Sequence, residues 1–135
     1  MGFVRHRLRR DEGFTLIELL IVLVIIGILL AIAVPSYLGF KDRANKRAAE
    51  SDIREAIPSM EACYSNNNSY ATCNVAALKA IDSGLSNAVV VSGLGATAYC
   101  IGAQVGSQSW SVSGPGATAW YSASTSCSGA SSTTP

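Results

Sequence analysis

The sequence predicts an α+β protein in which one long N-terminal helix packs on a small antiparallel β-sheet stabilised by disulfides. Three observations predict it: an apolar run near the N-terminus, an amphipathic stretch directly after it, and short β-prone runs in the C-terminal half. Of the 135 residues, 49% are apolar and 14% are charged, with a mean hydropathy of +0.30. This composition excludes a disordered or nucleic-acid-wrapping class.

The first element is the apolar run from residue 14 to residue 34, which only Glu18 interrupts. At about 1.5 Å per residue it spans roughly 30 Å, the thickness of a hydrocarbon core, and its length favours a helix over a strand. Two other interpretations stay open: a plain membrane anchor, and a secretory signal cleaved after Ala31-Ile32-Ala33 that would release a domain starting at Val34. Neither explains Glu18, whose carboxylate costs on the order of 3 kcal/mol at a membrane centre.

Beyond Pro35 the pattern becomes amphipathic, with apolar residues at steps of three to five and charged residues between them. The apolar positions are Tyr37, Phe40, Ala44, Ala48, Ile53, Ile57, Met60 and Tyr64. They predict that the helix continues to residue 64 and covers a domain. Pro35 and Pro58 are each expected to bend it, and Pro58 is an alternative end. Residues 66–69 predict a loop.

The C-terminal half predicts a short helix followed by a meander. Asn74 is a candidate N-cap for a helix that ends at Ile81, before Ser83-Gly84. Glycine-containing turns then separate four β-prone runs, at residues 88–91, 97–103, 109–112 and 118–122, which predict antiparallel strands. Residues 122–135 are mostly Ser and Thr and are expected to form an exposed, partly disordered tail.

The four cysteines predict disulfides, because their number is even. The sequence also lacks the C-x-x-C pair that is typical of a zinc or thioredoxin site. They are Cys63, Cys73, Cys100 and Cys127. Three pairings are formally open, and we favour the sequential one, in which each closure contributes roughly 3 to 4 kcal/mol. Since disulfides persist in oxidising compartments, the C-terminal domain is expected outside the cytoplasm. The basic residues flanking the apolar run are too evenly divided to decide the orientation.

The residues available for chemistry exclude several functions. The single histidine, His6, precludes His-based triads or metal sites in the rest of the chain. After Glu61 the only cation is Lys79, so no specific nucleic-acid binding is expected. Stacking of Trp110, Trp120, Tyr99 and Tyr121 on bases is an alternative, but at β spacing they are expected in the core. We predict no catalytic residue, no metal site and no cofactor.

One motif gives a family resemblance. The stretch from Arg9 to Leu20, RRDEGFTLIELL, resembles the class III signal of type IV pilins and pseudopilins, in which a short basic leader ends in Gly and Phe-Thr-Leu-Ile-Glu follows. The resemblance implies that a prepilin peptidase cuts after Gly13 and methylates the new amine of Phe14. It also implies that Glu18 engages the Phe14 amine of a neighbouring subunit, and that the stem can unwind between Gly27 and Pro35. An intrachain pair between Phe14 and Glu18 is the alternative.

The expected function is that of a structural subunit of a type IV pilus-like filament, stored in the membrane and assembled through its N-terminal helix, that serves adhesion, motility or surface interaction. A pseudopilin of a type II secretion system and a DNA-uptake pilin are the alternatives, and an enzyme is not expected. Calcium, which some pseudopilins bind near their C-terminus, is disfavoured because residues 83–135 contain no Asp or Glu.

The same resemblance predicts the organisation, partners and location of the chain. The expected segments are a leader (1–13), a transmembrane and polymerisation helix (14–35), an amphipathic helix (36–64) and a β-rich domain with its tail (65–135). The expected partners are copies of the chain in a homo-oligomeric filament, the prepilin peptidase and methylase, and the membrane assembly platform with its ATPase. The expected locations are the cytoplasmic membrane, with the C-terminal domain outside, and an extracellular pilus.

Overall fold

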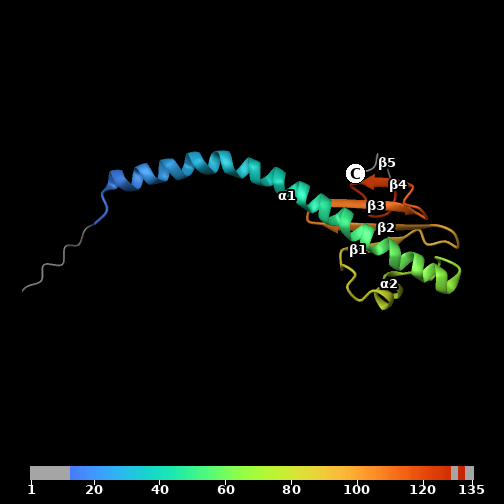
Figure 1. Ribbon diagram of the computed structural model, residues 1–135. Coiled ribbons are helices and arrows are strands. Elements are labelled where there is room, and N and C mark those ends of the chain that lie inside the picture. The colour runs from blue at the N-terminus through green and yellow to red at the C-terminus, as the bar shows by residue number, and fades with distance from the viewer. Residues whose placement is uncertain (1–12, 129–130, 133–135) are drawn as a thin grey trace, which may run out of the picture. The chain divides into compact units, whose positions relative to one another are not determined.

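The computed structural model describes residues 13–128 and 131–132, and in them it contains two helices and one five-stranded sheet (Figure 1). The chain divides into two units, Met1–Leu38 and Gly39–Pro135, which we describe separately. Of the expected leader, only Gly13 lies within the described residues. We call residues 14–38 the stem and the second unit the C-terminal unit.

Helix α1 (Leu16–Asn67) is a single element that passes through both Pro35 and Pro58. Pro58 therefore does not end the helix, and the predicted loop at residue 66 begins two residues too early. Each proline removes one backbone donor, and at the exposed Pro58 water can satisfy the carbonyl that is freed. Burial of α1 side chains on both sides of Pro58 stabilises the helix there. The helix ends before Asn68, whose φ of 53° lies in the left-handed region.

The second half of α1 buries a regular stripe in the C-terminal unit. Its members recur at steps of four and three residues: Ala49, Ile53, Ala56, Met60 and Cys63. The predicted stripe is right at Ile53 and Met60, and wrong at Ala44 and Ala48, which are exposed. The five-residue step from Ala48 to Ile53 turns the helix by about 140° beyond a full turn, so the two residues cannot share a face. Ile57 and Tyr64 are half-buried, whereas Tyr37 and Phe40 are exposed.

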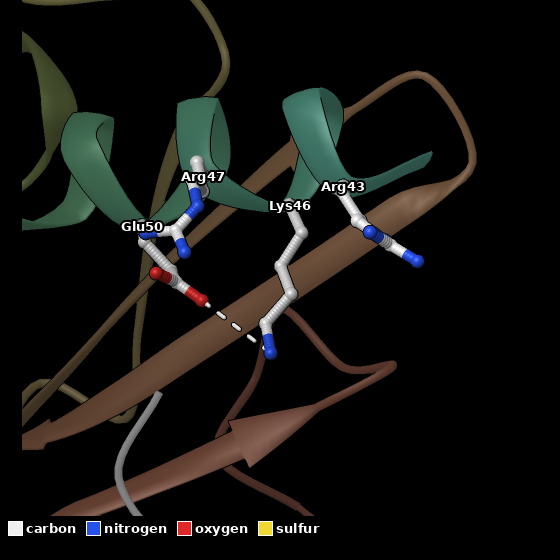
Figure 2. Close-up of a pocket in the computed structure, with 4 residues that line it drawn as sticks. All are labelled: Arg43, Lys46, Arg47 and Glu50. Carbon is white, nitrogen blue, oxygen red and sulfur yellow. Dashed lines mark ion pairs between the residues drawn. The ribbon is translucent and has the colours of Figure 1, made fainter. Parts of the chain in front are cut away.

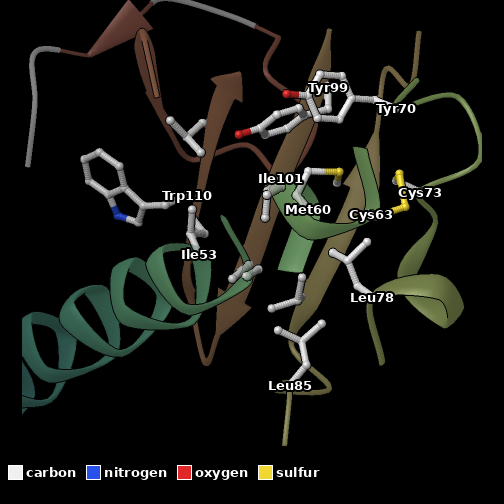
Figure 3. Close-up of a cluster of buried hydrophobic side chains, with 14 of the residues drawn as sticks. Ile53, Met60, Cys63, Tyr70, Cys73, Leu78, Leu85, Tyr99, Ile101 and Trp110 are labelled. Carbon is white, nitrogen blue, oxygen red and sulfur yellow. A yellow bond between two sulfur atoms is a disulfide. The ribbon is translucent and has the colours of Figure 1, made fainter. Parts of the chain in front are cut away.

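The sheet is an antiparallel meander in the strand order β1-β2-β3-β4-β5, as predicted for its first four strands. The strands are β1 (Val89–Ser92), β2 (Tyr99–Val105), β3 (Gln108–Gly114), β4 (Ala119–Ser122) and β5 (Ser131–Ser132). Gly106, with a φ of 58°, and Ser107 form the two-residue turn between β2 and β3. Residues of α1 and of β2 to β4, Trp110 and Trp120 among them, share one hydrophobic core (Figure 3). The expected core position of the two tryptophans and Tyr99 is confirmed, and Tyr121 is half-buried.

Helix α2 (Val75–Ile81) has the predicted N-cap. The Asn74 side chain accepts a hydrogen bond from the Ala77 backbone N–H at 3.0 Å, and Leu78 points into the core. This cap satisfies one of the donors that a helix start leaves free. The predicted short helix is therefore confirmed at both ends.

The C-terminal residues differ from the predicted tail. Ser131 and Ser132 pair with Tyr121 and Trp120 and add the fifth strand, which the sequence analysis missed. A serine pair has low β propensity, so its pairing depends on the tertiary position of the segment. The expectation for residues 129–130 and 133–135 lies outside the described residues.

The segment just before β5 packs against the sheet. Gly102 lies so close to the backbone of Thr125 that a methyl group at this glycine would overlap it. The Cys127 N–H donates a hydrogen bond to Ser111 Oγ at 3.0 Å. Since Gly102 and Ser111 are paired neighbours on β2 and β3, the segment covers the centre of the sheet.

Two disulfides connect these parts, in the sequential pairing. Cys63 bonds to Cys73, ten residues on, and joins the end of α1 to the loop before α2. Cys100 bonds to Cys127, 27 residues on, and joins β2 to the C-terminal segment. The structure thus ties both loop-rich parts of the C-terminal unit to regular elements.

Candidate functional site

The start of α1 is the first candidate site, because it holds the residues predicted for processing and assembly. Thr15 caps the helix: its Oγ1 accepts a hydrogen bond from the Glu18 N–H at 3.3 Å, and its carbonyl accepts one from the Leu19 N–H at 3.3 Å. Thr15 and Glu18 thus have the spacing of a capping box. This role of Thr15 was not predicted from the sequence, although Thr-x-x-Glu before an apolar run is a recognisable signal for it.

Glu18 is the only charged residue of the stem, and its side chain is exposed. It lies in the first turn of α1, where the free backbone N–H groups and the helix dipole favour a negative charge. The start of α1 therefore stabilises the Glu18 carboxylate without any contribution from a second chain. Pairing of Glu18 with the amine of Phe14 in another copy remains a prediction.

The stem exposes every large apolar side chain that it carries. From Leu16 to Leu38 none of these is less than 46% exposed, and Leu16 reaches 89%. Helix α1 is the one helix of the described residues that is long and apolar enough to cross a membrane. Soluble proteins rarely expose an apolar surface of this extent, so the stem requires lipid or other protein around it.

Gly27 and Pro35 both lie within α1, and the helix is continuous at each of them. A methyl group at Gly27 would meet no atom within 4 Å, so packing inside this chain does not require a glycine there. Both residues lower helix propensity, by about 1 kcal/mol for Gly and 3 kcal/mol for Pro. Unwinding of the helix between them remains a prediction.

A second feature is the charged surface of α1 at the start of the C-terminal unit. Arg43, Lys46, Arg47 and Glu50 line a shallow hollow of about 160 Å³ (Figure 2). Lys46 Nζ lies 3.8 Å from Glu50 Oε1 and 4.6 Å from the ring centroid of Trp110. The Lys46 ammonium is thus engaged by its own unit, through an ion pair and a cation–π contact.

A third cluster of polar groups has a structural role. Tyr70 donates a hydrogen bond to Glu61 Oε2 at 2.8 Å, and Tyr99 donates one to Glu61 Oε1 at 3.0 Å. Burial, strengthened by the Glu61 carboxylate, raises the pKa of Tyr70 to about 12 and also raises the pKa of Tyr99. These bonds join α1 to the following loop and to β2, and the aromatic rings are packed together (Figure 3).

The described residues bring together no group of three His, Cys, Asp or Glu side chains that could hold a metal ion. All four cysteines are in disulfides. The structure therefore contains an apolar stem with a capped helix start and, as a separate unit, a C-terminal part with two disulfides.

The apolar stem coincides with a known sequence motif. Residues 8–34 match the family described as the prokaryotic N-terminal methylation motif. This match contains Gly13, Phe14 and Glu18, on which the resemblance rests.

The chain is also similar in sequence to individual proteins. The chain is 45% identical over 71 residues to the type IV wide pilus major component PilA4 of Thermus thermophilus, covering 53% of each protein. It is 41% identical over 64 residues to the type II secretion system core protein G of Aeromonas hydrophila, covering 47% of this chain and 45% of that protein. It is also 39% identical over 61 residues to the type IV major pilin protein PilA of Myxococcus xanthus, covering 45% of this chain and 28% of that protein.

The chain thus spans about half the length of the first two relatives. By its methylation motif and these relatives, it is similar to type IV pilins and to core protein G of type II secretion systems. These relatives are structural proteins rather than enzymes.

Proposed function

We propose that the chain is the structural subunit of a type IV pilus-like filament, which is stored in the cytoplasmic membrane and assembled through its stem. The observation that carries the proposal is the methylation motif at residues 8–34, which leads into a fully exposed apolar helix with one charge. In the membrane, lipid covers the stem. In the filament, the stems of other copies replace lipid, and van der Waals packing stabilises the assembly.

Processing precedes assembly in this proposal. A prepilin peptidase cuts after Gly13 and methylates Phe14, which creates an amine four residues before Glu18 in the sequence. The Glu18 carboxylate of one copy then pairs with the Phe14 amine of its neighbour. Because the stem is otherwise uniformly apolar, helices could slide past one another, and one charge pair selects a single stagger. Gly27 and Pro35 allow local unwinding of the packed stem.

The remaining partners follow from this route. The membrane platform and its ATPase extract the subunit, and the C-terminal unit stays on the oxidising side, where its two disulfides form. Since exposed cations are sparse beyond residue 61, the proposal includes no specific nucleic-acid partner.

Processing is tested first, by mass spectrometry of material sheared from the cell surface. We expect a chain that begins with N-methylated Phe14 and is recovered from filaments. A chain that begins at Val34 would mean an ordinary secreted domain and would overturn the proposal.

Assembly is tested with a pair of substitutions at the start of α1. Glu18→Gln keeps a side chain that can complete a capping box but removes the charge. We expect it to insert in the membrane normally and to abolish filaments. Thr15→Ala, the matched control, removes the observed cap and keeps the charge, so filaments should remain. Filaments at the normal level in Glu18→Gln cells would refute the charge-pair role.

A pseudopilin of a type II secretion system is the second candidate, because several relatives are core proteins G of that system. Deletion of the gene separates the two functions. Loss of surface filaments with normal export of secreted proteins supports the pilus subunit, and loss of export with no change in filaments supports the pseudopilin.

A further inference from the structure

The start of the C-terminal unit exposes three cations on α1. Lys41, Arg43 and Arg47 are exposed, whereas Lys46 is engaged by Glu50 and Trp110. We call Lys41, Arg43 and Arg47 the basic collar. The only ion pair within 4.0 Å that the described residues form is the one between Lys46 and Glu50, so within this part of the chain no carboxylate lies that close to a cation of the collar.

The carboxylates that follow on α1 are mostly engaged inside the unit. Asp52 accepts a hydrogen bond from Ser86 Oγ at 3.0 Å, and Glu61 accepts two from tyrosines. The Glu50 side chain is only 13% exposed. In the rest of the chain, no acid follows Asp82. Two carboxylates are exposed on this part of α1: Asp42, which lies within the collar and accepts a hydrogen bond from Ser107 Oγ at 3.3 Å, and Glu55. Because Lys41, Arg43 and Arg47 outnumber Asp42, the collar keeps a net positive charge that attracts an anion.

The position of the collar in the sequence indicates which anion this is. The apolar stretch from Phe14 to Phe40 has a helical length of about 40 Å, roughly 10 Å more than a hydrocarbon core. When the first turn of the helix, with Glu18, lies in the cytoplasmic headgroup layer of about 5 to 8 Å, the hydrocarbon ends near Leu38. Lys41 and Arg43 then lie in the opposite headgroup layer, and Arg47 follows one turn later. Aromatic residues followed by Lys and Arg are typical of that level.

We propose that the basic collar binds the phosphate groups of anionic phospholipids in the non-cytoplasmic leaflet while the subunit waits in the membrane. The proposal rests on the proposed function, since it requires the stem to span a bilayer. The hollow between Arg43, Lys46, Arg47 and Glu50 gives a phosphate group access to two collar residues. The collar sets the depth of the stem, and its lipid contacts must break when the subunit leaves the membrane.

The test is photo-crosslinking of the full chain in vesicles. Ala44→p-benzoylphenylalanine places the probe on an exposed position within the collar, and Ser51→p-benzoylphenylalanine places it on the same outward face two turns further on. We expect a lipid adduct at position 44 that increases by at least about threefold when phosphatidylglycerol replaces one third of the phosphatidylcholine. At position 51 we expect little adduct in either vesicle.

Removal of charge supplies the second control. The triple variant Lys41→Gln, Arg43→Gln and Arg47→Gln should abolish the increase at position 44. The matched double variant Arg54→Gln and Lys79→Gln should keep it, because both cations are outside the collar and engaged within the C-terminal unit: Arg54 lies over the Trp120 ring, 5.2 Å from its centroid, and Lys79 donates a hydrogen bond to Asn87. An adduct yield that does not depend on phosphatidylglycerol, or that survives the triple substitution, would overturn the proposal.

Two further outcomes identify the competing explanations. A covalent dimer of two chains at position 44 in place of the lipid adduct overturns the proposal and makes the collar an interface between copies. Extraction of the chain by alkaline carbonate would overturn both this proposal and the membrane storage in the proposed function. A chain that resists carbonate but shows no dependence on phosphatidylglycerol contradicts the collar alone.

Discussion

The two halves of α1 have the same secondary structure and opposite surroundings. From Leu16 to Leu38 every large apolar side chain is at least 46% exposed, whereas Ala49, Ile53, Ala56, Met60 and Cys63 are at most 2% exposed. The first half is apolar on all sides, and the second half is apolar on one stripe. The difference shows that the second half is stabilised by its own chain, while the first half depends on lipid or on other protein.

Removal of the longer disulfide should affect the C-terminal unit most and the stem least. In the chain-entropy account, closing the 27-residue span between Cys100 and Cys127 contributes about 3.5 kcal/mol to the free energy of unfolding. We expect Cys100→Ser/Cys127→Ser to lose that amount in denaturant unfolding of the full chain in detergent, monitored by tryptophan fluorescence. Helical circular dichroism of the stem should persist. An unchanged unfolding midpoint would contradict the assigned role of the disulfide.

Truncation of the buried stripe compares the two halves directly. Ile53→Ala removes a fully buried side chain and should lower the free energy of unfolding by about 3 kcal/mol. Leu23→Ala, at a stem position that is 66% exposed, should change it by less than about 0.5 kcal/mol. Equal losses in the same detergent assay would mean that the stem packs on the C-terminal unit, and the distinction between the halves would fail.

The contact between Gly102 and Thr125 predicts a smaller loss. A methyl group at Gly102 would overlap the Thr125 backbone, so Gly102→Ala should cost about 2 kcal/mol through overpacking. At Gly95 the added methyl would lie 3.7 Å from the nearest atom, and Gly95→Ala should be close to neutral. Hydrogen exchange should increase at the Cys127 N–H in Gly102→Ala alone. Equal stability of the two variants would show that the C-terminal segment is not fixed on the sheet.

Removal of the N-cap of α2 should lower the free energy of unfolding by a smaller amount. Asn74→Ala removes the acceptor of the Ala77 N–H and should lower the free energy of unfolding by about 1 kcal/mol. Asn74→Asp keeps an acceptor and serves as the control. Chemical denaturation of both variants measures the difference, and a loss in Asn74→Asp as large as that in Asn74→Ala would assign the effect to something other than the cap.

Much of the architecture could be predicted because local signals and tertiary packing agree. The apolar run, the cap at Asn74 and the glycine turns of the meander each point to the structure that forms. Hydrophobicity alone could not show whether Ala48 or Ala49 faces the core, because both residues are alanines. Only a strict helical period counted from Ile53 selects Ala49.

The missed features depend on contacts that no local pattern contains. Strand β5 is a serine pair that gains its hydrogen bonds from the edge of β4. The engagement of Glu61 by two tyrosines, 9 and 38 residues away, likewise requires the folded unit. At the start of α1 the opposite holds: the capping box of Thr15 and Glu18 is local and could have been found in the sequence.

The tyrosine cluster predicts an effect confined to high pH. Because the pKa of Tyr70 is raised to about 12 and that of Tyr99 is also raised, both stay protonated in the folded unit at a pH where they ionise when unfolded. Their contribution to stability is fully present below about pH 10, and it is lost as the pH rises from there through the folded-state values. The free energy of unfolding should therefore decrease with pH in this range.

Two phenylalanine variants separate this effect from other causes of a loss of stability at high pH. Tyr99→Phe removes one of the two raised pKa values, so its stability should fall less steeply between pH 10 and about pH 12 than that of the wild type. Tyr37→Phe, in the exposed stem, should follow the wild-type slope. Thermal unfolding across this pH range measures all three. If the slope for Tyr99→Phe were as steep as that for Tyr37→Phe, the alkaline loss would come from groups outside the cluster. Burial in the C-terminal unit, together with the carboxylate of Glu61 on the second half of α1, raises the pKa of Tyr99, whereas Tyr37 lies in the exposed first half of the helix.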